Sequence, residues 1–150
     1  MTTQGTVSVT IEATPEDVWP WIGDITRHNQ WSPKPYRVDL VSGEPNSAGS
    51  RYRSVGWAPP NDSDHVNDVE ITEVQPPARF ALTATDASGA YANSFDLRPV
   101  GDGTEVTYRI VFPDMGGIAA ILLPILFRVV AMPGIKKRMR LLKQAVESAK

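Results

Sequence analysis

The chain has 150 residues, which is enough for one domain with a hydrophobic core and too few for two ordinary domains and a linker. It carries 15 Lys and Arg against 17 Asp and Glu, a net charge of −2, with 41% hydrophobic residues. This composition argues against a disordered tail and against a nucleic-acid-binding protein that relies on overall positive charge. The absence of cysteine excludes disulfides, a thiol nucleophile, Cys-ligated zinc and iron–sulfur clusters.

Charge is distributed unevenly along the chain. Residues 128–150 include seven basic residues and one acidic residue, so the rest of the chain is acidic. A basic end favours contact with an anionic surface or an acidic partner, or else it forms the solvated face of a helix. Residues 1–5 lack the basic start and apolar stretch of a signal peptide, so we expect a cytoplasmic protein.

The N-terminal part predicts a strand followed by two short helices. Residues 6–13 alternate between apolar and polar side chains, which is the period of a half-buried strand. Thr14 and Pro15 are a typical helix N-cap and first helical residue, and two acidic residues follow them. Pro20 predicts a kink or an early end of this helix, and a second helical turn is expected over residues 26–30.

Residues 36–112 predict strands and turns throughout. The candidate strands are 36–41, 50–57, 65–74, 78–85, 90–98 and 104–112, separated by segments rich in Gly, Pro, Asn and Asp. Such short connections predict an antiparallel meander in which consecutive strands pair.

The C-terminal part predicts helices. Four apolar residues at helical spacing, Ile135, Met139, Leu142 and Val146, indicate an amphipathic terminal helix. The stretch before it, residues 115–132, is apolar almost all round and is interrupted by Pro124. It ends where residues 133–134, Pro and Gly, begin. Arg128 divides this stretch into runs too short for a membrane span. A pocket lid, core packing or a partner-facing helix explains it better.

Five short motifs resemble those of a known superfamily. They are residues 14–19 (TPEDVW), 29–33 (NQWSP), 49–53 (GSRYR), 71–80 (ITEVQPPARF) and 142–147 (LKQAVE). Together with the order of elements, they resemble the START/Bet v 1-like superfamily, and within it the bacterial polyketide cyclase/dehydrase and lipid-transport group. The resemblance implies a single α+β domain with the helix-grip fold. In that fold a curved antiparallel seven-stranded sheet wraps around a long C-terminal helix, and two short helices lie between strands 1 and 2.

The resemblance also implies an apolar cavity between the sheet and the terminal helix, where a small molecule binds. Strand alternation and the apolar helical segment predict which side chains line it. The candidate ligand-binding residues are Trp31, Tyr52, Ser54, Phe80, Leu82, Tyr91, Asn93, Phe95, Tyr108, Ile110, Phe112, Leu122, Ile125 and Val129.

The polar members of this set are the most informative, because a buried polar group requires a partner. Asn93 lies on the inward parity between Tyr91 and Phe95, so its amide either orients a ligand carbonyl or hydroxyl, or bonds a neighbouring side chain. The tyrosines either offer a hydroxyl to a ligand or serve as core rings.

No catalytic constellation, metal-ligand spacing or cofactor motif stands out in the sequence, and we expect no cofactor, no metal and no nucleic-acid partner. His28 and His65 are predicted to lie at the surface. The strand arginines fall on outward positions: Arg51, Arg53, Arg79, Arg98 and Arg109.

The favoured function is therefore a carrier or sensor for a small hydrophobic molecule, such as a lipid, a fatty acid or a polyketide-like metabolite. Lys136, Lys137 and Arg140 are predicted to dock at an anionic membrane during loading or release. One alternative is a polyketide cyclase, aromatase or dehydratase. Another is a protein–protein interaction module that uses the apolar residues 118–132.

Overall fold

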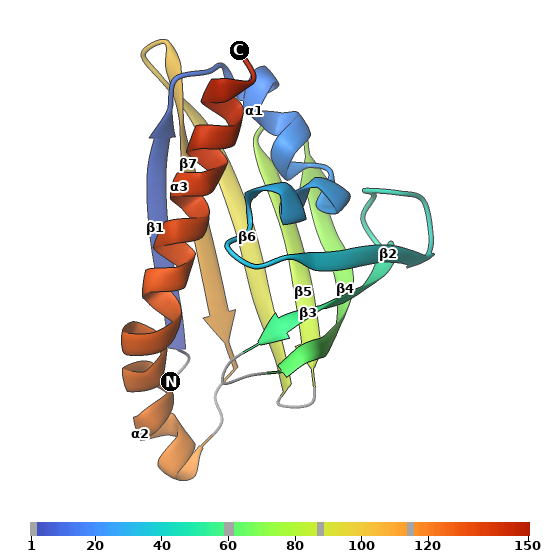
Figure 1. Cartoon of the computed structure of the whole chain (residues 1–150), viewed down its shortest axis with the longest axis vertical. Coiled ribbons are helices and arrows are strands. Elements are labelled where there is room, and N and C mark those ends of the chain that lie inside the picture. Colours follow the sequence, from blue (N-terminus) through green and yellow to red (C-terminus); the bar gives the residue numbers. More distant parts are fainter. Residues whose placement is uncertain (1–2, 59–61, 87–88, 114–115) are drawn as a thin grey trace.

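The computed structural model describes residues 3–58, 62–86, 89–113 and 116–150, which form a seven-stranded antiparallel sheet with helices on one of its faces (Figure 1). The sheet order is β1-β7-β6-β5-β4-β3-β2, so consecutive strands pair except where β1 closes on β7. The predicted α+β helix-grip fold and the meander are confirmed. The strands are β1 (Thr3–Ile11), β2 (Tyr36–Ser42), β3 (Arg51–Ala58), β4 (Asp62–Gln75), β5 (Arg79–Asp86), β6 (Gly89–Val100) and β7 (Gly103–Phe112).

β1 begins earlier than residue 6 because it pairs with the whole length of β7, from Thr3 opposite Phe112 to Ile11 opposite Thr104. It also ends before residue 13, since the Ala13 amide turns back to the Ile11 carbonyl at 2.9 Å. The predicted alternation holds along the strand, where Val7 packs against the core and Ile11 is fully buried.

The two short helices are α1 (Pro15–Ile22) and the 3-10 helix η1 (Ile25–Trp31). Thr14 caps α1, because its hydroxyl accepts a hydrogen bond from the Asp17 amide at 3.3 Å. Pro20 lies inside α1, and the helix ends two residues later, in agreement with the predicted early end.

The C-terminal part is one succession of helical segments: α2 (Gly117–Leu126), the π-helical turn η2 (Phe127–Ala131) and α3 (Met132–Ser148). The helical segments continue through Pro133, which lies in the first turn of α3 directly after the apolar stretch. The wider turn of η2, in which the Met132 amide bonds the Phe127 carbonyl, immediately precedes this proline. Within the described ranges, no helix is long and apolar enough to cross a membrane.

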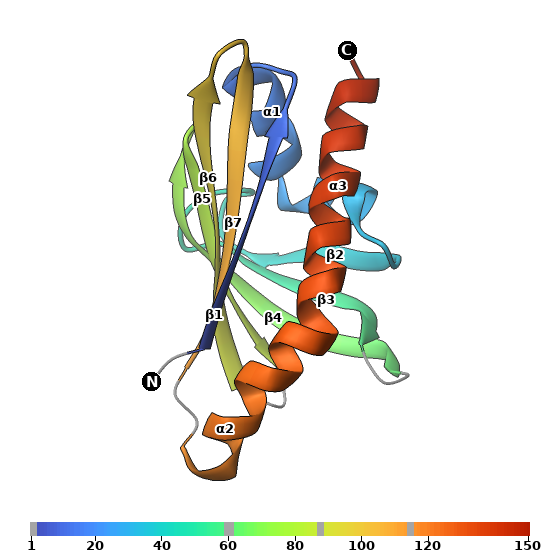
Figure 2. The same ribbon diagram turned by 90° about the vertical axis from the view of Figure 1, so that its left-hand side faces the viewer.

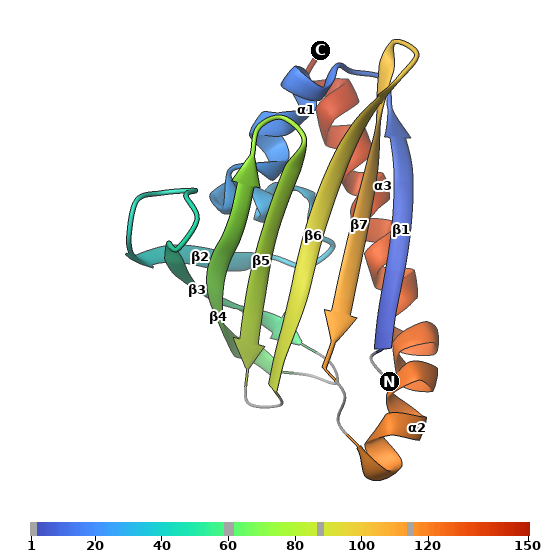
Figure 3. The same cartoon turned by 180° about the vertical axis from the view of Figure 1, so that it is seen from behind.

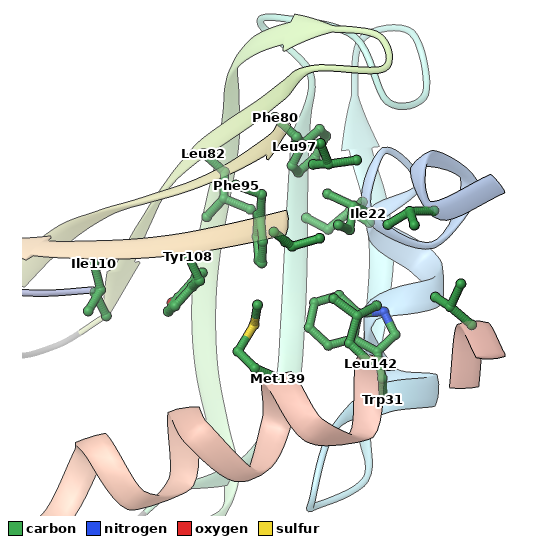
Figure 4. Close-up of a cluster of buried hydrophobic side chains, with 14 of the residues drawn as sticks. Ile22, Trp31, Phe80, Leu82, Phe95, Leu97, Tyr108, Ile110, Met139 and Leu142 are labelled. Carbon is green, nitrogen blue, oxygen red and sulfur yellow. The ribbon is translucent and has the colours of Figure 1, made fainter. Parts of the chain in front are cut away.

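The helices lie on the concave side of the sheet. Figure 2 shows the sheet edge-on, with β2, β3 and β4 curving toward α3, and Figure 3 shows the opposite face without helices in front of it. α3 packs against β1 and η1 and presents Met139, Leu142 and Val146 to the core. In the close-up of Figure 4, Met139 points from α3 toward the strands that carry Phe95 and Tyr108. One end of the space between α3 and the sheet is therefore filled by core side chains.

Candidate functional site

A cavity of about 510 Å³ lies between α3 and the inner face of the sheet. The pairing register explains its apolar wall, since Leu82 on β5 is opposite Asn93 on β6, and Asn93 is opposite Ile110 on β7. Side chains with this parity share one face of the sheet. Ile135 on α3 and Phe112 at the end of β7 extend the same apolar surface.

A buried polar pair lies on the sheet side of this cavity. The Tyr108 hydroxyl donates a hydrogen bond to Oδ1 of Asn93, and both side chains are buried. Burial raises the pKa of Tyr108 to about 12. The hydroxyl therefore keeps its proton at neutral pH and holds the Asn93 amide in place.

A second polar group lies where β4, β5 and β6 run side by side. His65 Nε2 is 3.0 Å from Oδ2 of Asp86, and the side chains are only 26% and 12% exposed. Next to them, the Tyr91 hydroxyl donates to Oδ1 of Asn67 at 3.4 Å. Burial, together with the Asp86 charge, raises the pKa of Tyr91. An imidazole paired with a carboxylate is an acid–base couple, and here it faces the cavity.

A third polar group of the cavity wall contains Lys34 and Arg138. They are the only lysine and arginine among the described residues that line the cavity. The guanidinium carbon of Arg138 lies 4.5 Å from the centre of the Trp31 ring. His28 packs between Trp31 and Phe80, and its Nε2 is 2.7 Å from the Ile22 carbonyl oxygen. Burial, reinforced by the Arg138 charge, lowers the pKa of His28 to about 3. His28 is therefore neutral at pH 7, and its Nε2–H donates to Ile22.

The described residues contain no group of three or more His, Asp or Glu side chains arranged to hold a metal ion. The site therefore consists of an apolar volume with polar groups at three places on its wall. Such a surface suits a ligand that is mostly apolar and carries a few oxygen substituents.

The sequence matches a family of known proteins across nearly its whole length. Residues 2–147 match the family described as "Polyketide cyclase / dehydrase and lipid transport". The chain belongs to this family. Curated proteins give no match to the chain.

Solved structures with the same fold as this family member are numerous and distant in sequence. TTHA0849 from Thermus thermophilus superposes with a TM-score of 0.72 at 19% identity, over 98% of this chain and 99% of that one. Protein Ms6760 from Mycobacterium smegmatis gives 0.69 at 17% identity, over 98% and 92%. The di-domain ARO/CYC StfQ from the steffimycin biosynthetic pathway gives 0.80 at 12% identity, over 99% of this chain and 52% of that one. At such identities the likeness shows the fold.

The structure of this polyketide cyclase/dehydrase and lipid-transport family member brings many of the predicted ligand-binding residues to the cavity. The residues that line it as predicted are Ser54, Leu82, Tyr91, Asn93, Phe95, Tyr108, Ile110 and Phe112. All lie on strands, where the two-residue period identified the inner face. Asn93 bonds a neighbouring side chain, that of Tyr108, and also lines the cavity; its contact with a ligand stays a prediction.

Three predicted residues are buried without lining the cavity. Trp31 lies behind Arg138, and its Nε1 donates to the Trp21 carbonyl oxygen at 3.1 Å. The Tyr52 hydroxyl accepts a hydrogen bond from the Asn46 amide at 2.8 Å, which ties it to the loop after β2. Phe80 is fully buried at the α1 end of the sheet. These side chains have the predicted inward parity and lie where the core is filled.

Leu122, Ile125 and Val129 are corrections, because they are 48%, 57% and 68% exposed and lie outside the cavity lining. The physical reason is the length of the sheet, since among the described residues the β1–β7 pair stops at Thr3 opposite Phe112, so most of α2 has no strand to pack against. α2 extends past this edge (Figure 2).

The predicted surface positions of both histidines are also wrong. His28 is 2% exposed because η1 is a 3-10 helix with three residues per turn, which puts it on the same face as Ile25 and Trp31. His65 shares the inward parity of Val69 on β4.

In contrast, the strand arginines lie as predicted on outward positions. Arg79 is half-buried in ion pairs with Glu73 and Asp96, and the others are exposed: Arg51, Arg53, Arg98 and Arg109.

Proposed function

We propose that this protein binds one small, largely apolar molecule in the cavity between α3 and the sheet, as a carrier or sensor. The observation that supports this is a volume of about 510 Å³ walled mainly by aliphatic and aromatic side chains. Burial of apolar ligand surface contributes roughly 25 cal/mol per Å² before the cost of association. Candidate ligands are lipids, fatty acids and polyketide-like metabolites.

Native mass spectrometry of the freshly purified protein, followed by organic extraction, tests this proposal. We expect a co-purifying apolar molecule at close to one copy per chain. Ala84→Leu narrows the cavity, whereas Ala92→Leu changes an exposed position on β6 and is the matched control. Ala84→Leu is expected to lose the bound mass and Ala92→Leu to keep it. A chain without bound mass, with a thermal midpoint unmoved by a panel of hydrophobic ligands, would overturn the proposal.

A polyketide cyclase, aromatase or dehydratase is the second candidate, and the His65–Asp86 pair favours it. These reactions need a group that removes a proton next to a ketone and another that stabilises the enolate. His65 beside Asp86 has the chemistry of the first group, and Arg138 and Tyr36 have that of the second.

Turnover of model poly-β-ketones by the pure protein tests this candidate. If it is correct, His65→Gln lowers the rate by about a hundredfold or more, as loss of a general base does. Val66→Gln, which changes the exposed neighbour of His65 on β4 outside the cavity, is the matched control and retains most of the rate. A wild-type rate equal to background would exclude this function.

A further inference from the structure

Arg138 brings a positive charge into the apolar cavity. On α3 it lies one turn after Ile135 and one turn before Leu142, so it shares the face of the helix that is turned toward the sheet. Its guanidinium covers the Trp31 ring and lines the cavity.

The charge of Arg138 lacks a carboxylate partner among the described residues. Its Nε is buried and has no hydrogen-bond partner, and none of the described ion pairs includes it. Its field reaches several lining groups: it lowers the pKa of His28 and opposes the effect of burial on the pKa values of Tyr36, Tyr91 and Tyr108.

A guanidinium stays charged in proteins, and a buried donor without an acceptor is unfavourable. An anionic ligand group would provide both the missing acceptor and the opposite charge. The planar fork of Arg matches the two oxygens of a carboxylate, which makes this the best-fitting anion. The hydroxyl of Tyr36 lies beside Arg138, and a hydrogen bond between the two side chains partly offsets the effect of burial on the pKa of Tyr36. This hydroxyl provides a further donor to the ligand carboxylate.

We propose that the ligand of this cavity is an apolar carboxylic acid whose carboxylate is held by Arg138, with its apolar part along Leu82, Ile110 and Phe112. This inference rests on the proposed function and adds the chemical class of the ligand. The bound acid is ionised, because Arg138 provides a permanent positive charge and burial raises the pKa values of Tyr36, Tyr91 and Tyr108, which stay neutral.

Calorimetric titration with straight-chain acids of eight to twelve carbons, each compared with the alcohol of the same length, tests the proposal. Wild-type protein is expected to bind the best acid at least about tenfold more tightly than its alcohol, as a charge-assisted hydrogen bond predicts. Arg138→Met should remove this preference and leave the affinity for the alcohol within about threefold, because the apolar wall is unchanged. Arg140→Met removes an exposed charge from the same helix and should keep the preference.

The outcomes separate the two proposals. Equal binding of acid and alcohol by wild-type protein overturns the carboxylate inference and leaves the proposed function standing. Binding of neither probe overturns both. Arg138→Lys keeps the charge without the fork and covers the case in which Arg138→Met does not fold: a preference undiminished in Arg138→Lys would show that the two-oxygen geometry is wrong.

A different observation, on the outside of the molecule, carries a second inference. α2 and η2 expose a continuous aliphatic surface, with side chains 48% to 74% exposed. We call it the 118–130 surface. It consists of Ile118, Ile121, Leu122, Ile125, Leu126, Val129 and Val130.

Basic residues accompany this surface, and acidic residues are absent from it. Arg128 lies within it, and Lys136, Lys137 and Arg140 follow on α3, all exposed. The sequence has no Asp or Glu from residue 116 to residue 146. Apolar side chains next to cations are typical of helices that lie in the surface of an anionic bilayer. A symmetric dimer through the same surface would bring these cations together, which is unfavourable.

The geometry points to docking of the 118–130 surface on an anionic lipid bilayer. α2 is at one end of the molecule (Figure 1), where it can enter the interface without disturbing the core. Ala131 and Ile135, which line the cavity, come directly after this surface in the chain. Docking would therefore place the cavity beside the lipid.

Co-sedimentation with vesicles tests the docking, using phosphatidylcholine alone or with 30% phosphatidylglycerol. Wild-type protein is expected to bind the anionic vesicles, and the triple variant Lys136→Gln, Lys137→Gln, Arg140→Gln should bind roughly tenfold or more weakly. Ile121→Asn with Ile125→Asn should abolish binding. Val41→Asn, at an exposed position on β2, is the control and should bind normally.

Absence of vesicle binding by wild-type protein overturns the docking, and equal binding to both vesicle types overturns the role of charge. Sedimentation velocity provides a further check. A dimer that Ile121→Asn with Ile125→Asn dissociates would assign the 118–130 surface to a second copy of the chain instead.

Discussion

A neutral histidine and a charged arginine lie together at one end of the cavity. His28 remains unprotonated because it is buried and because Arg138 adds a positive charge nearby. The Ile22 carbonyl accepts its Nε2–H and holds the ring in place. This pairing has a consequence for stability, because the unfolded chain offers His28 a normal pKa of about 6.5.

The folded state binds fewer protons at His28 than the unfolded state, so stability is lost as the pH falls from about 6.5 toward 3. His28→Gln removes this titration and keeps an N–H donor for Ile22. The variant should be less stable than wild type at pH 7.5. Between pH 7.5 and 5.5 its deficit should shrink by about 1.4 kcal/mol. Urea unfolding at both pH values measures the effect, and a deficit independent of pH would contradict it.

The spacing of Arg138 and His28 in the sequence indicates inward positions for both. The polar character of the two residues and of their neighbours instead suggested exposed positions. Arg138 is three residues after Ile135 and four before Leu142, both inward positions, yet it lies in a segment whose basic residues are mostly solvated. His28 is three residues from Ile25 and from Trp31, a spacing that identifies a shared face only if the helix is 3-10. Periodicity therefore located the core, and the polar residues on the same face were missed.

At the scale of elements, the strands were predictable because alternation is a strong signal. The prediction of β5 stopped one residue too early, at its polar end. Asp86 continues the inward series of Phe80, Leu82 and Ala84 on β5, but it is a polar residue next to a turn, so the sequence assigned it to the turn. Tyr36 at the start of β2 was inside the predicted strand 36–41, but it was not among the candidate ligand-binding residues.

The contact between β1 and η2 depends on Gly5. A Cβ atom at this position would lie 2.3 Å from Cε1 of Phe127 and 3.0 Å from Sδ of Met132. Gly5→Val should therefore displace Phe127 from its contact with Phe112 and destabilise the protein by about 1 to 3 kcal/mol, as overpacking does. Urea unfolding checks this value. Unchanged stability would show that α2 and η2 are not anchored here.

Gly134 is the opposite case. It lies inside α3, is exposed, and has no heavy atom within 4 Å of the position of an added Cβ. Gly134→Ala should stabilise the protein by about 0.5 to 1 kcal/mol, because alanine restricts the unfolded chain and favours the helix. A rise in the thermal midpoint is the expected readout, and a fall would mean that the helix is interrupted at this point.

At the scale of the whole molecule, α3 serves the core and the cavity together. Its residues Met139 and Leu142 (Figure 4), together with Val146, fill one end of the space against the sheet. Ile135 and Arg138 face the open volume at the other end. The order of elements predicted this arrangement, because a meander can bury its inner face only under the terminal helix. Where the filled part ends depends on side-chain packing, which the sequence does not specify.

Leu142→Ala tests how far the cavity depends on this packing. Leu142 is fully buried, so its truncation should reduce the free energy of unfolding by about 2 to 5 kcal/mol. Affinity for an apolar probe should fall with it, since the wall formed by α3 loosens. Gln144→Ala, exposed on the same helix, should change neither quantity. Retained affinity in a strongly destabilised Leu142→Ala would show that the cavity is held by the sheet alone.

The π-helical turn η2 sets the rotational phase of α2 relative to α3. It holds one residue more per turn than a regular helix, and each residue in a helix advances by about 100° around the axis. Because the wider turn absorbs this extra residue, a variant with one residue deleted within Phe127–Ala131 would form a regular helix and keep the orientation of α2. Rewinding the undeleted turn to a regular α-helix would instead rotate α2 by about that angle relative to α3. The aliphatic side chains that now face outward would then point in another direction, so the direction of this surface depends on the width of a single turn.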